Sequence, residues 1–391
     1  MADAECSLRQ VLVEIAERND YTNHNIDIKG FNSGGANYTS AIFFATISSS
    51  GKDDLDLFAK VAIVGEKIRN KSTVDRMFTT EQTFYNDLAT VWDGYQSKYS
   101  VPDDEKFVFP KFYGGSPKRG EETVVLNNLV ARGYETYNRF KSVDWQYASK
   151  AIETLAKFHA LSFVFEKESP EEHEKICKEL VYQMGGEEDS TKKVWERMVE
   201  SSIQVLNDEH KGRVMKFMEK HTSMESFMKY YRPLGKSVLI HGDYRPSNLL
   251  YKKQDDSLQV IPVDYQTLRA GSPVSDLIYF IFVGSDQKFR ENHYQQLVEH
   301  YYQQLCLALA RFQIDPADVY PREKFDVDFK EMLPFAVLLG VFLLPIITVE
   351  AESAPRMDGD ADFDSFVVKP NELFAQRFTE LIADCIRYEI I

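Results

Sequence analysis

The sequence predicts an α+β fold with two lobes: a small lobe built on an antiparallel sheet and a large lobe that is mainly helical. Three observations carry this prediction. The 391 residues are too many for one simple core. Strand patterns separated by turn residues fill the stretch from 26 to 64, and helical patterns dominate from residue 144 onward. A crossover separates the two regions, so we expect residues 1–127 to form the small lobe and residues 128–391 the large one.

The small lobe is predicted to begin with an amphipathic helix over residues 7–20. Strands are expected over 26–31, 38–47 and 55–64, with a glycine-containing turn at 32–37 between the first two. Backbone N–H groups of such a turn can bind phosphates, which makes Gly34, Gly35 and Asn37 candidates for nucleotide contacts. Most turns of this kind only close a hairpin, so the turn alone is a weak signal.

Lys60 is a charge between apolar neighbours on the third strand, and a charge in such a place needs a partner. Glu81 is a candidate, because residues 73–92 are predicted to form a helix with Glu81 on the face of its aromatic residues. An ion pair between the two would aim the lysine at the α- and β-phosphates of a nucleotide. The alternative is that both side chains face solvent.

Two further strands are predicted over 107–113 and 123–126, around a loop at 114–122. The crossover between the lobes follows at 127–134. Adenine would be bound there by backbone groups, so Asn127 and Leu129 are candidate nucleotide contacts through their main chain.

The large lobe is predicted to start with a helix capped by Asp144. His159 on that helix is expected to be packed and hydrogen-bonded rather than catalytic. The charged helical residues 166–236 either wall an acceptor site or serve only solubility. Ser275 or Asp276 can cap a later helix; alternatively, Asp276 reaches back to hold the backbone of a catalytic loop. Further helices are expected over 290–312, 331–349 and 371–388.

The most apolar stretch is residues 333–349, which contains two prolines. We interpret it as a buried helix, because a membrane span needs about 20 apolar residues. Residues 357–366 carry alternating aspartates, but Phe363 stands where a calcium loop needs glycine and Lys369 where it needs glutamate. This segment is therefore expected to be an exposed acidic loop.

Composition narrows the class of protein. Hydrophobic content of 43% and charged content of 27% are ordinary for a globular protein. The net charge of −15 argues against nucleic-acid binding and gives no reason to expect an anionic membrane as partner. Four cysteines far apart in the sequence predict neither a zinc site nor a disulfide framework. With an acidic N-terminus that lacks the pattern of a signal peptide, these features predict a cytoplasmic protein, expected to be a monomer.

The main chemical signal is a polar loop between two apolar runs, residues 238–251. Asp243 and Asn248 lie five apart in it, and a short apolar strand at 260–263 ends in Asp264. This pattern suits phosphoryl transfer. Asp243 would accept the proton of an acceptor hydroxyl, while Asn248 and Asp264 would hold Mg²⁺ against the phosphates of ATP.

Neighbours of Asp243 in the loop have supporting roles. His241 is expected to brace the loop by hydrogen bonding rather than to act as a base, and Gly242 lets the turn close tightly. Arg245 could stabilise charge on the transferring group as part of the catalytic machinery. It could equally pair with an acidic neighbour on the surface.

These motifs resemble the aminoglycoside phosphotransferase and choline kinase branch of the protein-kinase-like superfamily. More closely, the chain resembles the ecdysteroid kinase-like (CHK kinase-like) family of insects and other arthropods, over roughly residues 25–350. The features that carry this resemblance are Gly35-Ala36-Asn37-Tyr38-Thr39-Ser40, Leu57-Phe58-Ala59-Lys60-Val61, Glu81 with Phe84-Tyr85, Phe158-His159-Ala160, His241-Gly242-Asp243 with Asn248, Asp264-Tyr265-Gln266, and Ser272-Pro273 before Asp276-Leu277-Ile278-Tyr279-Phe280.

The resemblance implies a two-lobed protein-kinase-like fold and ATP-dependent phosphorylation of a hydroxyl on a small, often apolar molecule, such as an ecdysteroid or a xenobiotic. It implies Asp243 as catalytic base, Asn248 and Asp264 as metal ligands, Lys60 as phosphate contact and Glu81 as its partner.

The chain departs from the family pattern at two places. Asn127-Asn128-Leu129 stands at the crossover, where the family usually has an acidic residue first. Residues 244–247, expected to face the acceptor, read Tyr-Arg-Pro-Ser, where the family often has a tryptophan two positions after the aspartate. Two alternatives therefore stay open: a kinase for choline, ethanolamine or an aminoglycoside, and a non-catalytic binding module on the same scaffold.

Overall fold

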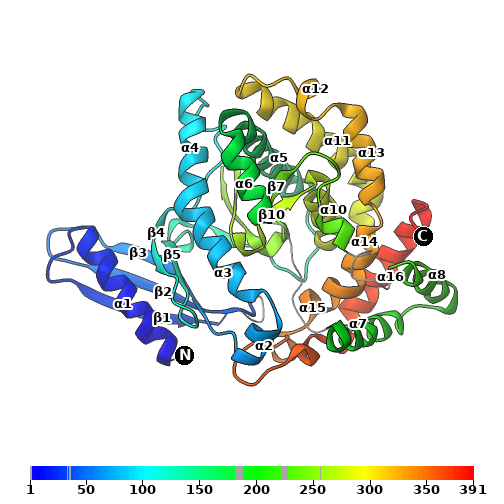
Figure 1. The fold of residues 1–391 in the computed structure, drawn as a ribbon, viewed down its shortest axis with the longest axis horizontal. Coiled ribbons are helices and arrows are strands. Elements are labelled where there is room, and N and C mark those ends of the chain that lie inside the picture. Colours follow the sequence, from blue (N-terminus) through cyan, green and yellow to red (C-terminus); the bar gives the residue numbers. More distant parts are fainter. Residues whose placement is uncertain (1, 33, 35–36, 181–187, 222–227, 256) are drawn as a thin grey trace.

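The structure is a computed structural model, and it describes residues 2–32, 34, 37–180, 188–221, 228–255 and 257–391. It confirms the predicted fold class: an antiparallel sheet with one long helix on its face lies at one end of the molecule, and helices make up most of the remainder (Figure 1). The lobe boundary between residues 127 and 128 stays a prediction.

The main sheet has five antiparallel strands in the order β1-β2-β3-β5-β4. Their bounds are β1 Asn25–Phe31, β2 Ser40–Ser48, β3 Leu55–Ala62, β4 Phe112–Ser116 and β5 Thr123–Asn127. Helix α1, Ala2–Arg18, covers one face, where Leu12 and Ile15 are buried against Phe43 and Leu57. This arrangement fixes β3, the strand that carries Lys60, in the middle of the sheet.

The predicted strand at 107–113 is wrong in its position: β4 begins only at Phe112 and continues through two glycines to Ser116. The preceding segment is held in another way. The N–H of Phe107 donates to Gln96 Oε1 over 2.6 Å, and Pro110 has no N–H for a strand ladder. Gly115 allows the sheet to continue, since a Cβ there would lie 2.1 Å from the carbonyl oxygen of Thr123.

The predicted helix at 73–92 is longer and irregular. After the short α2, Glu66–Lys71, it runs as α3, Val74–Thr83, through a π-helical turn, Phe84–Leu88, into α4, Ala89–Lys98. Three residues of the π-turn, Phe84, Tyr85 and Leu88, are buried, and Phe84 stacks on Tyr265 with ring centroids 3.6 Å apart. The irregular turn therefore packs directly beneath the loop that follows Asp264.

The large lobe is arranged around α5, Trp145–Glu168, whose N-terminus is capped by Asp144 as predicted: its carboxylate accepts from the N–H of Tyr147. Two small sheets lie against this helix. They are β7, Val238–Ile240, with β10, Arg269–Gly271, and β6, Glu135–Thr136, with β8, Leu249–Gln254, and β9, Ser257–Pro262. The remaining helices are α6 Pro170–Glu179, α7 Glu188–Ile203, α8 Asp208–Glu219, α10 Pro273–Gly284, α11 Gln287–Arg311, α12 Pro316–Val319, α13 Arg322–Met332, α14 Phe335–Leu338, α15 Leu344–Thr348 and α16 Glu372–Arg387.

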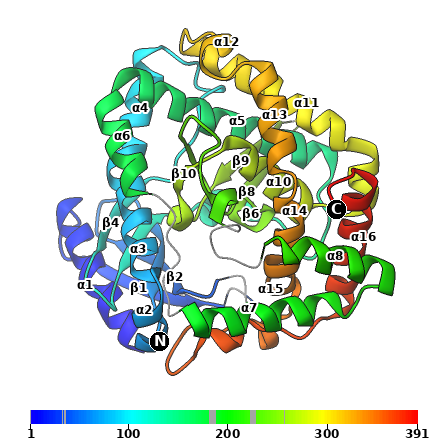
Figure 2. The same cartoon turned by 45° about the vertical axis from the view of Figure 1, so that its right-hand side comes forward.

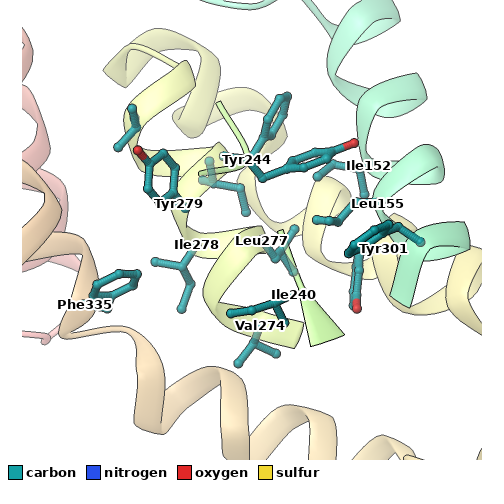
Figure 3. Close-up of a cluster of buried hydrophobic side chains, with 14 of the residues drawn as sticks. Ile152, Leu155, Ile240, Tyr244, Val274, Leu277, Ile278, Tyr279, Tyr301 and Phe335 are labelled. Atoms are coloured by element: carbon teal, nitrogen blue, oxygen red, sulfur yellow. The ribbon is translucent and has the colours of Figure 1, made fainter. Parts of the chain in front are cut away.

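Helix α10 lies in the centre of the large core, and all its residues are buried. Its side chains pack with those of α5, β7 and α14 (Figure 3). His159 on α5 is buried as predicted and contacts the hydroxyl of Tyr301 at 2.7 Å. The loop that follows β7 therefore packs on a buried apolar core.

The predicted helix over 331–349 is irregular. Leu333 and Pro334, both with helical dihedral angles, separate α13 from α14, and α14 leads through a second π-turn, Leu339–Leu343, into α15. Pro345 has no N–H to give to the carbonyl of Val341, which accepts instead from Ser202 Oγ of α7 over 2.7 Å. Among the described residues, the run 322–348 is the one helical stretch long and apolar enough to cross a membrane, but 72% of its apolar window is buried in the protein.

Residues 351–368, called here the strap, connect α15 to the final helix and lie beside both lobes (Figures 1 and 2). The N–H of Gly65 donates to the Met357 carbonyl over 2.7 Å, and Met357 packs against Ile68 and Phe78. On the other side, Asp364 pairs with Arg197 of α7 at 2.8 Å. The acidic segment is exposed in part, as expected, but it also ties α2 to α7.

Candidate active site

The catalytic loop follows β7 and is held from below by Asp276 of α10. One carboxylate oxygen accepts from the N–H of His241 over 2.7 Å, and the other accepts from the N–H of Gly242 over 2.9 Å. Burial would raise the pKa of Asp276, but the hydrogen bond and charge of His159 outweigh it and lower that pKa. The predicted reach back to the loop is confirmed. The capping alternative is wrong, because α10 begins after Ser272 with no side-chain cap.

The loop turns sharply at Gly242, whose φ of 82° lies in the left-handed region. A Cβ there would lie 2.4 Å from the carbonyl oxygen of Thr267. His241 braces the turn as predicted. Its Nδ1 accepts from the N–H of Asp243 at 3.3 Å, and its Nε2 donates to the carbonyl of Val263 at 3.1 Å. Burial lowers the pKa of His241, which keeps the ring neutral in this role.

Asp243 is surrounded by hydrogen-bond donors. Its Oδ2 accepts from Asn248 Nδ2 at 2.8 Å and from Arg245 Nε at 3.2 Å. Its Oδ1 accepts from the hydroxyl of Tyr279. Arg245 is buried, so the predicted alternative of a surface ion pair is wrong: its acidic neighbour is Asp243 itself. Burial acts to lower the pKa of Arg245, but the carboxylate of Asp243 outweighs it and raises that pKa.

Lys60 forms the predicted ion pair with Glu81, with Nζ and Oε1 2.9 Å apart. The same Nζ lies 2.6 Å from Oδ1 of Asp264, a contact the sequence did not predict. Burial acts to lower the pKa of Lys60, but the two carboxylates outweigh it and raise that pKa. Burial raises the pKa of Glu81, and for Asp264 the charge of Lys60 overcomes burial and lowers the pKa. Lys60 is therefore a fixed cation held between the two lobes.

Asn248 and Asp264 stand at neighbouring ends of paired strands. The N–H of Val263 donates to the carbonyl of Asn248 over 2.9 Å, and Asp264 then turns away with a φ of 70°. An amide and a carboxylate are oxygen ligands of the kind magnesium takes. Across the residues that the structure describes, no group of three or more His, Cys, Asp or Glu side chains could hold a metal by itself. The pair fits an ion whose other ligands are phosphate oxygens and water.

The glycine-containing turn is described only in part, and Gly35 lies outside the described residues. The carbonyl of Gly34 accepts from Arg139 Nη2 of the large lobe over 2.8 Å. The side chain of Asn37 accepts from the N–H groups of Thr39 and Ser40, so its carboxamide shapes the turn.

Two predicted nucleotide contacts lie at the crossover. Asn127 is the last residue of β5, and its Oδ1 accepts from the N–H of Lys111 over 2.7 Å. Leu129 is buried, and its carbonyl accepts from the N–H of Tyr134. The side chain of Asn127 thus shapes the crossover, and that of Leu129 is packed. Their main chain is partly engaged as well, since the N–H of Asn127 donates to the carbonyl of Lys111 over 2.9 Å. Hydrogen bonds and ion pairs join Asp243, Arg245 and Asn248 to one another, and Lys60 to Glu81 and Asp264. Among the described residues, none joins either crossover residue to these groups.

The expectation that residues 244–247 all face the acceptor is wrong for Tyr244. Its side chain is fully buried, and its hydroxyl donates to the carbonyl of Ala151 on α5 over 2.7 Å (Figure 3). The tyrosines that lie near Asp243 are Tyr279 and Tyr38. Tyr38, beside the turn, is close enough to Arg245, Arg139 and Asp243 for their charges to act on its hydroxyl, although burial is the main cause of its raised pKa.

Tyr38, Arg139 and Tyr279 are site residues that the sequence reasoning missed. For Tyr279 a signal was present, since it lies three residues after Asp276 and therefore on the same face of α10. Tyr38 and Arg139 carry no local signal. They are brought to the site by contacts with the carbonyls of Ile346 and Ile347, more than 200 residues away.

Comparisons with known proteins identify the family of the chain. The sequence model of the ecdysteroid kinase-like family matches residues 34–314, which is more than half of the chain. No curated protein sequence matches the chain. A solved structure of a microcompartment-associated aminopropanol kinase is 11% identical and covers 97% of each chain, with a TM-score of 0.47.

A choline/ethanolamine kinase family protein from Mesorhizobium loti is 15% identical, with 98% of this chain and 100% of that chain covered and a TM-score of 0.38. It is the family match that establishes the reaction type, with a small molecule as phosphoryl acceptor. The chain therefore belongs to the ecdysteroid kinase-like family and is a phosphotransferase of the small-molecule kinase type.

Proposed function

We propose that the protein transfers the γ-phosphate of ATP to a hydroxyl of an uncharged, apolar alcohol, an ecdysteroid or a related xenobiotic. The observation that carries this proposal is the setting of Asp243. Its carboxylate is held by Arg245, Asn248 and Tyr279 and lies in a surrounding of cations and tyrosines. This setting supports both the role of Asp243 as base and the class of acceptor.

The nucleotide side of the site is provided by Lys60, held between Glu81 and Asp264. A buried lysine that remains charged is suited to bind the α- and β-phosphates. We assign the backbone of the glycine-containing turn to the phosphates and the main chain of the crossover to adenine. The residues concerned are Gly34, Gly35, Asn37, Asn127 and Leu129.

Asn248 and Asp264 would hold magnesium, which when bound neutralises charge on the transferring phosphate. In that arrangement Asp264 would exchange part of its contact with Lys60 for the ion. Asn248 donates its Nδ2 to Asp243, which leaves its amide oxygen as the metal-facing atom.

Asp243 orients the acceptor hydroxyl and takes its proton. As the acceptor oxygen bonds to the γ-phosphorus, the bond from that phosphorus to the β,γ-bridging oxygen breaks and ADP leaves. Arg245, anchored on Asp243, stabilises the negative charge of the transferring group. The products are a phosphate monoester, ADP and the proton held by Asp243.

The charged groups near Asp243 support a neutral alcohol as the acceptor. Arg245 and Arg139 both act on the hydroxyl of Tyr38 near Asp243, so the described surroundings of the base are rich in cations and phenol rings. A choline- or aminoglycoside-type acceptor carries positive charge and would be repelled there, whereas a neutral alcohol with an apolar body would pack on the rings.

The test is phosphoryl transfer from radiolabelled ATP to ecdysone, choline and kanamycin in parallel. We expect label on ecdysone, and we expect Asp243→Asn to lower kcat by about 10²- to 10⁴-fold, the usual contribution of a general base. Label on choline or kanamycin alone would refute the neutral-alcohol assignment. A variant Asp243→Asn as active as the wild type would refute the role of Asp243.

A further inference from the structure

Tyr279 is a buried tyrosine of α10 whose hydroxyl donates to Oδ1 of Asp243. It lies one helical turn after Asp276, the residue that holds the N–H groups of His241 and Gly242. The same helix therefore fixes both the backbone of the catalytic loop and the carboxylate that the loop presents. In Figure 3 the hydroxyl of Tyr279 points away from the centre of the apolar cluster.

The orientation of an aspartate carboxylate is not fixed by its own rotamer preferences, because the terminal torsion of aspartate is broad. Hydrogen bonds must therefore set it. Arg245 and Asn248 both act on Oδ2. Within the part of the chain that the structure describes, Oδ1 of Asp243 accepts from Tyr279 alone, so Tyr279 is the group that determines where this oxygen points.

A carboxylate oxygen has two lone pairs, and the hydroxyl of Tyr279 uses one of them. Among the described residues, no other group donates to Oδ1, and the side chain of Asp243 is 17% exposed. An acceptor hydroxyl can therefore approach Oδ1 while Tyr279 stays in place.

We propose that Tyr279 is a positioning residue for phosphoryl transfer, which holds Oδ1 of Asp243 at the angle from which it takes the proton of the acceptor. This inference rests on the proposed function. Tyr279 remains protonated throughout and exchanges no atom with the acceptor. Its effect is to keep the base aligned, so it acts on the rate of the chemical step and leaves nucleotide binding alone.

The test compares Tyr279→Phe with a matched control, Tyr320→Phe. Like Tyr279, Tyr320 is 5% exposed and donates to a buried carboxylate, Oδ2 of Asp328 on α13 at 3.0 Å, and not to a residue of the loop at 241–248. We expect Tyr279→Phe to lower kcat about 10- to 100-fold and to change KM for ATP by less than about twofold. Tyr320→Phe should keep the wild-type kcat.

The rates are measured with ecdysone, choline and kanamycin, and also without acceptor, where water takes the place of the alcohol. If the wild type turns over ATP but Tyr279→Phe keeps its kcat, the positioning role is refuted while the proposed function stands. The same holds if both tyrosine variants lose kcat equally, or if KM for ATP rises as much as kcat falls. If the wild type shows no turnover under any condition, the proposed function is refuted and the positioning role with it.

Discussion

At the scale of single residues, the site contains polar side chains that are buried and hydrogen-bonded to the loop or to one another. His241 is the clearest case, since it accepts from the loop at one ring nitrogen and donates to the β9 end at the other. It joins the base-bearing loop to the strand end that carries Asp264. A neutral ring is required for both contacts, because a protonated ring could not accept from the N–H of Asp243.

This requirement predicts a pH dependence of stability. Burial lowers the pKa of His241, so the unfolded chain takes up the proton more readily than the folded one. Stability is therefore lost as pH falls below about 6.5, the ordinary value for histidine, down to the lowered folded pKa. In His241→Gln the free energy of unfolding in urea should depend less on pH between 7 and 5, by at most about 1.4 kcal/mol per pH unit.

Burial also lowers the pKa of His173 and His221, and both histidines remain in the variant. His241→Gln should therefore keep part of the wild-type dependence of unfolding free energy on pH. If the free energy of unfolding of His241→Gln depends on pH as strongly as that of the wild type, His241 does not hold the loop as a neutral ring.

At the scale of elements, close backbone contacts decide how segments distant in sequence meet. Gly65 precedes α2 and donates to the strap, and a Cβ on it would lie 2.0 Å from the carbonyl oxygen of Gly359. The absence of a side chain at residue 65 is thus what lets the strap lie against the small lobe.

Gly65→Ala should therefore displace the strap and lower the free energy of unfolding by about 1–3 kcal/mol, the usual cost of overpacking. The matched control is Gly94→Ala in α4, where a Cβ would meet nothing within 4 Å. That variant should be up to about 1 kcal/mol more stable, since alanine favours a helix over glycine.

Urea unfolding and limited proteolysis across residues 351–368 measure both effects. Equal stability and equal resistance to proteolysis in Gly65→Ala and the wild type would show that the strap does not depend on this contact.

At the scale of the whole molecule, several ties connect the small sheet and its helices to the large lobe. Three of them are the cluster of Lys60 with Asp264, the strap, and the contacts of the glycine-containing turn with the end of α15. Arg139 is central to the last one. It donates to the carbonyl of Gly34 on the turn and to the carbonyl of Ile347 on α15, each over 2.8 Å.

Because a hydrogen bond from a charged donor contributes roughly 1.5–3 kcal/mol, Arg139→Ala should raise KM for ATP about 10-fold by releasing the turn. Arg213→Ala on α8, which removes an exposed arginine paired with Glu209, is the control and should leave KM unchanged. Steady-state kinetics at varied ATP gives the answer, and equal KM values in the two variants would exclude a role of this tie in nucleotide binding.

The sequence by itself determined the reaction type, and it predicted the groups that we propose carry it. The spacing of Asp243, Asn248 and Asp264, and the order of Lys60 before Glu81, are local patterns whose meaning depends on a few neighbouring residues. The cap at Asp144 follows from the same kind of short-range rule, whereas the contact of Asp276 with the loop joins residues 34 and 35 positions apart. The limits of strands and helices were less well predicted where a proline lacks the N–H for a backbone hydrogen bond and a side chain bonds to the main chain instead. This is the case before β4 and within 331–349.

Beyond the predicted pair of Lys60 and Glu81, the tertiary structure alone decided which polar groups of the site meet. Asp264 reaches Lys60 across 204 residues, and Tyr279 reaches Asp243 across 36, while Tyr244, adjacent to the base in sequence, points into the core. The physical reason is that charge pairing and burial depend on how lobes and helices pack, and residue spacing along one segment does not encode that packing. Local sequence pattern thus determined the type of reaction, and packing determined which distant side chains contact Lys60 and Asp243.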